Sequence, residues 1–508
     1  MLRGILTVGG WTMGSRVLGF ARDILIAAML GAGPVADAFF VANRLPNLFR
    51  RLFGEGAFNA AFVPAFSGLL AAEGEAEARR FAAEAASVMA FWLVGITVLA
   101  EIFMPAVLLL IAPGFAAIPD KFALAVDLSR ITFPYMPLIC LTALFSGVLN
   151  GMDRFAAAAA APLIYNLVSI GFMVGLAGLV PTAGHALAWG VSVSGVFQLA
   201  LLVWAVRRAG MAISLPRPRL TPRMRLLFRR MGPGLVGAGV TQLNLAVDVI
   251  IGSLLPAGTV AILYYADRIN QLPLGTIGVA VGTALLPTLS RQALGGQARE
   301  AIDTLNRALE YALALTLPAA LALLTVPGPI LAVLFERGAF TAEDARLSAQ
   351  ALAAYASGLP AFVLVKVLVP AFFARGDTAT PVKIGMATVG LNLALNVAFM
   401  LPFAHLGPPL ASSVAAWLNV AVLAFVLIRR GHMALDGELM RAVPRMMLAG
   451  LLMVAALLAL EAGLFARLAG GWRWAGLGVL VAGGMAAYGV AGQLTGAFDV
   501  RALARRRR

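Results

Sequence analysis

The chain of 508 residues is built almost entirely from apolar stretches that are long enough to cross a lipid bilayer. Cutting it at polar residues and Gly/Pro breaks gives about fourteen candidate spans, each near the ~20 residues that a membrane-crossing helix requires. With 61% hydrophobic and only 12% charged residues, a soluble globular protein is excluded. The sequence therefore predicts an all-α polytopic membrane protein.

Basic residues in the short loops predict the orientation of these spans. If the N-terminus is cytoplasmic, the dense run from Arg207 to Arg230 and most other loop arginines share its side. The opposite side collects only Lys121, Arg337, Arg346, Arg467 and Arg473. By the positive-inside rule we expect both termini to be cytoplasmic, and the net charge of +15 to be mainly a topology signal. The basic tail should meet anionic lipid headgroups rather than nucleic acid.

The sequence also repeats itself at a spacing of about 222 to 225 residues. Leu30 to Ala36 is echoed by Leu255 to Ala261, and the Arg207-Arg208 pair is echoed by Arg429-Arg430. Six spans is an even number, so both halves enter the membrane from the same side and form parallel repeats. The predicted organisation is a six-helix lobe, a basic cytoplasmic linker, a second six-helix lobe, and two extra helices with a basic tail, at residues 1–206, 207–230, 231–430 and 431–508.

Arginines stand inside or at the edges of stretches that otherwise read as lipid-spanning helices: Arg16, Arg22, Arg44, Arg50, Arg51 and Arg268. A guanidinium near the bilayer centre costs about 2.5 to 3.5 kcal/mol, so it is kept facing a bundle interior or a wet cavity. The same stretches contain only four acids to balance these six arginines: Asp23, Asp37, Glu55 and Asp267. The excess positive charge predicts an anionic ligand, and a diphosphate suits arginine's planar fork.

Helical spacing indicates which of these charges share a face. Arg16 and Asp23 are seven residues apart, whereas Arg22 lies on a neighbouring stripe. Pro46 interrupts the second span and leaves the direction of Arg50 undecided. One stripe of that span would hold Asp37, Arg44, Arg51 and Glu55 if the helix ran straight.

Further polar stripes lie in the second half of the sequence. Tyr264, Arg268 and Gln271 follow helical spacing beside Asp267. Amide and carboxylate oxygens suit a small hard cation such as Na⁺, and they recur in two groups: Thr241, Asn244 and Asp248, and Asn392 and Asn396. Hydrogen bonding between helices explains the same residues equally well. The three histidines lack metal-ligand spacing, and the lone Cys140 can form no intrachain disulfide.

Two features have simple structural interpretations. Arg51 and Glu55 are four residues apart and could form an ion pair within one helix. Gly147 with Gly151, and Gly278 with Gly282, match the small-xxx-small pattern and predict close helix packing.

The charged segments closely resemble the MurJ (MviN) lipid II flippase family. The resemblance is specific at Ser15 to Asp23, Gly31-Ala32-Gly33, Asp37 to Ala42, Leu45 to Leu48, Arg50-Arg51 and Glu55 to Phe58. It continues at Tyr264 to Arg268 and from Gly278 to Pro287, and it covers essentially the whole chain. Members of this family belong to the MOP transporter superfamily. They move an undecaprenyl-diphosphate-linked peptidoglycan precursor across the bacterial inner membrane.

The resemblance implies a role for each matching position. The expected substrate-binding residues are Arg16, Arg22, Asp23, Asp37, Arg44, Arg50, Arg268 and Gln271. A Na⁺ site would use Asp248, Asn392, Asn396 and Ser412. The chain departs from the family at Gln271, where close relatives carry an acid, and at an asparagine in the cation site. Coupling to Na⁺ or H⁺ is thus an open expectation, and no organic cofactor is expected.

The expected partners are lipid II, membrane lipids and, transiently, the cell-wall synthesis machinery, but not nucleic acid. Transport would occur by alternating access, with the head group in an arginine-lined central cavity and no chemical bond changed. Two rivals are transporters: an exporter of another lipid-linked oligosaccharide, and a cation-coupled exporter of the same superfamily. A polytopic enzyme acting on polyprenyl phosphates is the third rival, but the external loops hold few candidate catalytic acids.

Overall fold

The computed structural model describes residues 2–53, 57–468 and 470–497. Within these ranges, side chains are described except at 2–7, 52–53, 57, 233–241, 243–245 and 279–284. This part of the chain consists of helices joined by turns and loops, and its only extended pairing is an isolated bridge between Arg337 and Phe340. The prediction of an all-α protein is confirmed.

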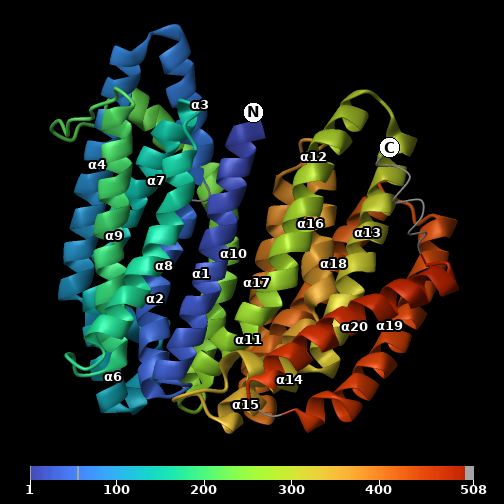
Figure 1. Cartoon of the computed structure of the whole chain (residues 1–508). Coiled ribbons are helices and arrows are strands. Elements are labelled where there is room, and N and C mark those ends of the chain that lie inside the picture. Colours follow the sequence, from blue (N-terminus) through green and yellow to red (C-terminus); the bar gives the residue numbers. More distant parts are fainter. Residues whose placement is uncertain (1, 54–56, 469, 498–508) are drawn as a thin grey trace. The chain divides into compact units, whose positions relative to one another are not determined.

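The chain divides into two compact units. Figure 1 shows the whole chain, coloured by position in the sequence. The first unit comprises Met1–Ala261 and Arg337–Phe340. Its helices are α1 (Leu2–Leu30), α2 (Pro34–Phe53), α3 (Ala57–Ala72), α4 (Glu75–Ile102), α5 (Met104–Ile111), η1 (Pro113–Ala117), α6 (Pro119–Thr132), α7 (Tyr135–Gly151), α8 (Ala156–Leu176), α9 (Ala183–Arg208) and α10 (Pro222–Leu254).

The second unit comprises Ile262–Glu336 and Thr341–Arg508. Its helices are α11 (Thr259–Pro273), η2 (Leu274–Gly278, a π-helical turn), α12 (Val279–Leu294), α13 (Ala298–Thr325), α14 (Pro327–Phe335), α15 (Ala342–Ala356), α16 (Leu359–Phe373), α17 (Ala379–Phe403), η3 (Ala404–Leu406), α18 (Gly407–Arg429), α19 (Gly437–Gly463), η4 (Phe465–Arg467) and α20 (Trp472–Thr495). Helices α19 and α20 pack on each other, and α19 also packs on α13 (Figure 1).

Nine apolar stretches within the described residues are long enough to cross a membrane. Two of them, Pro119–Gly151 and Ala342–Phe373, each consist of two consecutive helices, and Ala379–Arg429 consists of α17 and α18. Helices α1 and α2 lie outside these nine stretches, since polar and charged residues interrupt their apolar sequence. The chain is a multi-pass membrane protein by this measure, while the count of about fourteen spans and the parallel repeat stay predictions.

Helix α2 continues through Pro46 because neighbouring side chains satisfy the backbone there. Proline has no N–H, so the carbonyl of Ala42 loses its helical donor, and the Thr132 hydroxyl, which also reaches the carbonyls of Leu128 and Ser129, lies 3.3 Å from this oxygen. The Asn47 amide donates to the carbonyl of Asn43 at 2.8 Å. Such replacement bonds allow a proline inside a membrane helix.

Glycines on α7 allow α3 to approach closely. A Cβ atom at Gly147 would lie 3.1 Å from a ring carbon of Phe62, and one at Gly151 would lie 2.6 Å from a ring carbon of Phe66. The predicted close packing at Gly147 and Gly151 is therefore confirmed.

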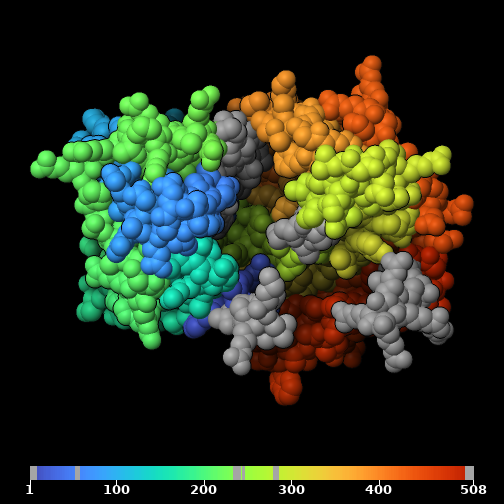
Figure 2. All heavy atoms as spheres, turned by 90° about the horizontal axis from the view of Figure 1, so that it is seen from above, coloured from blue at the N-terminus to red at the C-terminus, as the bar shows by residue number. Residues whose placement is uncertain are grey.

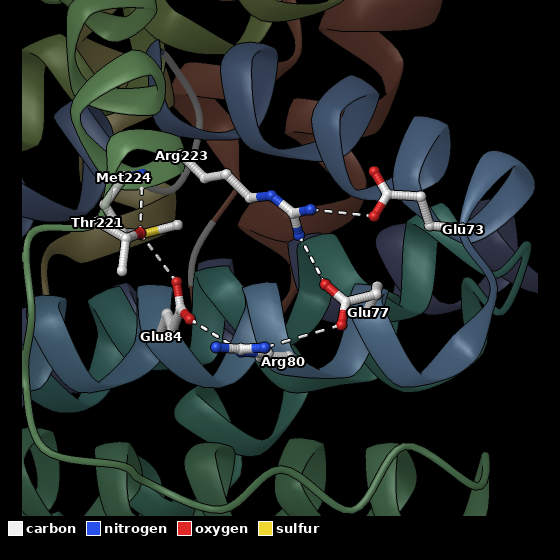
Figure 3. A network of polar contacts seen from close by, with 7 residues as sticks. All are labelled: Glu73, Glu77, Arg80, Glu84, Thr221, Arg223 and Met224. Atoms are coloured by element: carbon white, nitrogen blue, oxygen red, sulfur yellow. Dashed lines mark hydrogen bonds and ion pairs between the residues drawn. The ribbon is translucent and has the colours of Figure 1, made fainter.

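The predicted basic linker is partly helical. Helix α9 extends to Arg208, residues 209–221 form no helix, and α10 begins at Pro222. Figure 3 shows how the start of α10 is anchored: Arg223 pairs with Glu73 at 3.0 Å and with Glu77 at 2.8 Å, and the Thr221 hydroxyl donates to Glu84 at 2.9 Å. Seen from above in Figure 2, the segment after α9 (green) lies beside the α3–α4 turn (blue).

The boundary between the two compact units lies at a different place in the chain from the boundary between the predicted lobes. The lobes 1–206 and 231–430 were inferred from the internal repeat, and they stay a prediction. The first compact unit extends to Ala261 because α10 packs against α3 and η1.

Candidate functional site

Arg22 projects from α1 and is held in place by α8. Its Nη1 donates to Oδ1 of Asn166 at 3.0 Å, and its Nε and Nη2 donate to Oδ1 of Asp23 at 3.2 and 2.7 Å. The guanidinium carbon lies 5.1 Å from the centre of the Tyr165 ring. Only 12% of the Arg22 side chain is exposed, and none of the Asp23 side chain. Unit 1 thus holds a largely buried guanidinium in one orientation, within an ion pair with Asp23.

Asn166 connects α8 to α1 through both the oxygen and the nitrogen of its side-chain amide. While its oxygen accepts from Arg22, its Nδ2 donates to the Ser15 carbonyl at 3.0 Å and to the Ser15 hydroxyl at 3.4 Å. Helical spacing placed Asp23 with Arg16, but Asp23 bonds to its neighbour Arg22, because a long guanidinium side chain can fold back. The sequence analysis missed Asn166, although a buried amide in an apolar span signals a specific partner.

Arg50 lies near the end of α2. Its Nε donates to Oδ1 of Asn47 at 3.1 Å. The Tyr135 ring centre lies 5.6 Å from that of Tyr165, with the two rings tilted, and the Tyr165 ring lies against the Arg22 guanidinium. The structure therefore places Tyr165 and Tyr135, which the sequence analysis did not identify, beside Arg22.

Other predicted charges of unit 1 are less enclosed. Arg16 on α1 and Arg51 on α2 are exposed, and Arg44 on α2 is half-buried. Glu55 lies outside the described residues, so its predicted pair with Arg51 stays a prediction.

Asp37 occupies a different environment, at the start of α2. Its Oδ2 accepts from Lys121 Nζ and from the Gly258 backbone N–H, both at 2.6 Å, and its Oδ1 accepts from the Ala261 N–H at 2.8 Å. The ammonium also lies 4.0 Å from the centre of the Phe115 ring. Both charged side chains are almost fully buried. The carboxylate thus joins α2, α6 and the first turn of α11, and its predicted contact with substrate stays a prediction.

The second unit presents the predicted Arg268 stripe on α11. Arg268 and Asp267 are half-buried, and the exposed Gln271 donates to Oδ1 of Asp267 at 3.2 Å. The helix then passes through Pro273 into the π-helical turn η2. Irregular turns of this kind occur often at functional sites.

The residues of the predicted Na⁺ site lie in both units. Asp248 is on α10 in unit 1, whereas Asn392 and Asn396 are on α17 and Ser412 is on α18 in unit 2. The Asn396 amide donates to the Asn392 side chain at 2.9 Å. Its own oxygen is buried and accepts no hydrogen bond from the described residues, as a cation ligand would require. The only carboxylate of the set lies in the other unit, so the Na⁺ site stays a prediction.

Within the described part of the chain, no group of three His, Cys, Asp or Glu residues could hold a metal. Thr241 and Asn244, which the sequence analysis grouped with Asp248, have side chains outside the described residues.

Comparison with known proteins agrees with this description. The family model described as "Lipid II flippase MurJ" matches residues 26–472. A probable lipid II flippase MurJ of Rhizobium tropici is 44% identical over 508 residues, which cover 98% of this chain and 95% of the relative. A second one, of Rhizobium meliloti (strain 1021), is 45% identical over 461 residues, covering 90% of this chain and 86% of the relative.

Solved structures show a similar fold. A structure titled "Lipid II flippase MurJ, inward closed conformation" aligns with a TM-score of 0.79 at 23% identity, covering 96% of this chain and 98% of that one. An inward-facing multidrug resistance MATE family transporter of the MOP superfamily aligns with a TM-score of 0.67 at 14% identity, covering 84% and 98%. Both share the fold of this chain.

Proposed function

This chain belongs to the lipid II flippase MurJ family, and from this premise we propose how it flips lipid II across the bacterial inner membrane. The substrate is a large amphiphile with a polyprenyl tail, a diphosphate and a polar head group. Flipping changes no covalent bond, so the protein needs a place for the head group and a path for the tail, and it needs no catalytic residues.

The observation that carries the proposal is the enclosed guanidinium of Arg22. Hydrogen bonds from Arg22 to Asn166 and Asp23 fix its orientation, while 12% of the side chain stays exposed. A pre-oriented guanidinium binds phosphate oxygens in pairs and loses little side-chain freedom on binding. We propose that Arg22, with Arg16, Arg44 and Arg50 in unit 1 and Arg268 in unit 2, binds the diphosphate and adjoining head group.

The proposed cycle is alternating access, in which the two predicted six-helix lobes rock relative to each other while the tail stays in lipid. Loop charges support cytoplasmic placement of both termini. The membrane potential could bias the cycle, because moving one charge through 100 mV is worth about 2.3 kcal/mol. A drug exporter is disfavoured, since a cavity for cationic drugs should carry net negative charge, whereas the predicted site residues include six arginines against four acids.

The first test is complementation of a bacterium that lacks its own lipid II flippase. The wild-type chain should restore lipid II on the outer face of the membrane, and Arg268→Ala should not, because the head group loses one of its phosphate partners. The matched control is Arg291→Ala, which removes an exposed arginine from the same unit and should transport normally. Normal transport by Arg268→Ala at equal expression would contradict the proposed site.

A further inference from the structure

The start of helix α10 is held against the α3–α4 turn by one arginine that reaches two acids (Figure 3). Nη2 of Arg223 lies 3.0 Å from Oε2 of Glu73, and Nη1 lies 2.8 Å from Oε2 of Glu77. Glu73 lies in the turn after α3, whereas Glu77 lies in the first turn of α4. We call Arg223, Glu73 and Glu77 the α10 clamp.

Further contacts fix the position of the helix start beside the clamp. Thr221 caps α10, since its hydroxyl oxygen accepts from the Met224 N–H at 3.4 Å, and the same hydroxyl donates to Oε2 of Glu84 at 2.9 Å. Met224, Leu227 and Met231 follow helical spacing and are buried. One apolar face of the helix start therefore packs within unit 1, where α10 contacts α3 and α4.

The charges of the α10 clamp are accessible to water. The exposed fraction of the side chain is 44% for Arg223, 43% for Glu73 and 36% for Glu77. Exposed ion pairs of this kind are weak and are screened by salt, whereas breaking a buried pair such as Asp37 with Lys121 is strongly unfavourable. The α10 clamp is therefore suited to being broken and formed again.

The clamp lies where the chain passes from one predicted lobe to the other. Residues 207–230 form the predicted linker, and the internal repeat assigns the residues after 230 to the second lobe. The structure nevertheless packs α10 against α3 of the first unit. Rocking of the predicted lobes would move α10 relative to the α3–α4 turn, and the clamp joins these two elements.

We propose that the α10 clamp opens and closes once in each transport cycle, as a releasable contact between the start of α10 and the α3–α4 turn. The inference rests on the proposed function, because rocking of the lobes is what requires the clamp to open. Closed, the clamp holds the helix start on the first lobe. Open, it lets α10 move with the second lobe.

A reversible covalent link tests whether opening is required. In the purified full-length protein, Glu77→Cys/Arg223→Cys is bridged by a bifunctional reagent that forms a disulfide with each thiol. We expect lipid II flipping in liposomes to fall in proportion to the cross-linked fraction, and reduction to restore it. The matched control is Arg80→Cys/Glu84→Cys, bridged within α4, which should flip equally well before and after cross-linking. The native Cys140 is buried.

The outcomes separate this inference from the proposed function. Unchanged flipping after complete cross-linking of the clamp would overturn the inference, because the clamp could then stay closed throughout the cycle. A wild-type protein that flips no lipid II would contradict the proposed function itself.

Spin labels at two exposed positions, Arg79→Cys on α4 and Arg229→Cys on α10, measure the opening directly. Pulsed electron resonance should find a short and a long distance between the labels. Arg223→Gln should raise the ratio of the long to the short distance about fivefold, the effect of losing weak exposed pairs. The control Arg225→Gln removes an exposed arginine from the same helix turn and should leave the ratio unchanged.

Salt provides an independent readout of the same contact. A high concentration of NaCl should raise the share of the long distance in the protein with an intact clamp, because salt screens exposed charges. It should have no such effect in Arg223→Gln, where the clamp is already lost. A single distance that responds neither to Arg223→Gln nor to salt would overturn the inference.

Discussion

At the scale of single residues, the candidate site depends on an amide that orients a guanidinium. Asn166 accepts from Arg22 and donates to Ser15, so it fixes the arginine relative to both α1 and α8. Buried polar groups of this kind are costly when one partner is missing. The arginines were visible in the sequence because charge is rare in a membrane span. The roles of Asn166 and Tyr165 could not be predicted from the sequence, because their partners on α1 lie about 150 residues away along the chain.

We expect Asn166→Leu to lower the rate of lipid II flipping by about tenfold, equivalent to the ~1.4 kcal/mol of one lost hydrogen bond that orients a charged group. The variant should fold, since leucine fits a membrane helix. Asn166→Gln keeps the amide and should restore part of the rate. Flipping by Asn166→Leu at the wild-type rate would show that Arg22 needs no support from α8.

The buried pair of Asp37 and Lys121 leads to a prediction about stability. Lys121→Met leaves the Asp37 charge without its ammonium partner and should destabilise the protein by about 3–5 kcal/mol. The double variant Lys121→Met/Asp37→Asn removes both charges and should recover much of this loss. Unfolding in detergent measures both effects. Equal destabilisation of the single and double variants would contradict a charge-pairing role.

At the scale of helices, small residues determine how closely the elements of unit 1 pack. Gly195 on α9 faces α7, where a Cβ atom would lie 2.7 Å from a ring carbon of Tyr135. The ring centre of the same tyrosine lies 5.6 Å from that of Tyr165, whose ring lies against the Arg22 guanidinium. Helix packing and the candidate site therefore share one residue.

Gly195→Val should lower the melting temperature, because overpacking of a tight contact costs about 1–3 kcal/mol. Displacement of Tyr135 should also slow flipping. Gly175→Val on α8 is the control, since no atom lies within 4 Å of the position that its Cβ would take. A melting temperature for Gly195→Val equal to that of the control would show that α7 and α9 can separate without loss.

At the scale of the whole molecule, hydrophobicity alone predicted the helical fold, and unusual charges predicted several site residues. Helical periodicity could not predict how those charges pair. Asp37 lies on a stripe with Arg44, yet its carboxylate binds Lys121 and the backbone of α11, which depends on how distant helices fold together. Lys121 was assigned to an external loop, and the structure buries it. Local sequence identifies charges that are costly to bury, but tertiary packing determines their partners.

The compact units also differ from the lobes inferred from the repeat. The lobes were inferred from a sequence repeat, whereas compactness reflects packing, and α10 packs with the first unit. Anchoring of α10 by Arg223, Glu73 and Glu77 involves exposed charges, as Figure 3 shows. Exposed pairs of this kind contribute little stability and are weakened by salt.

The most direct test of the central claim uses purified protein in liposomes that contain fluorescent lipid II, with the translocated fraction measured by a reagent confined to one side. We predict that the wild type moves lipid II to the opposite leaflet, and that Arg22→Ala, reconstituted as folded protein at equal density, does not. Translocation by Arg22→Ala at the wild-type rate would contradict the claim that an oriented arginine binds the substrate's diphosphate.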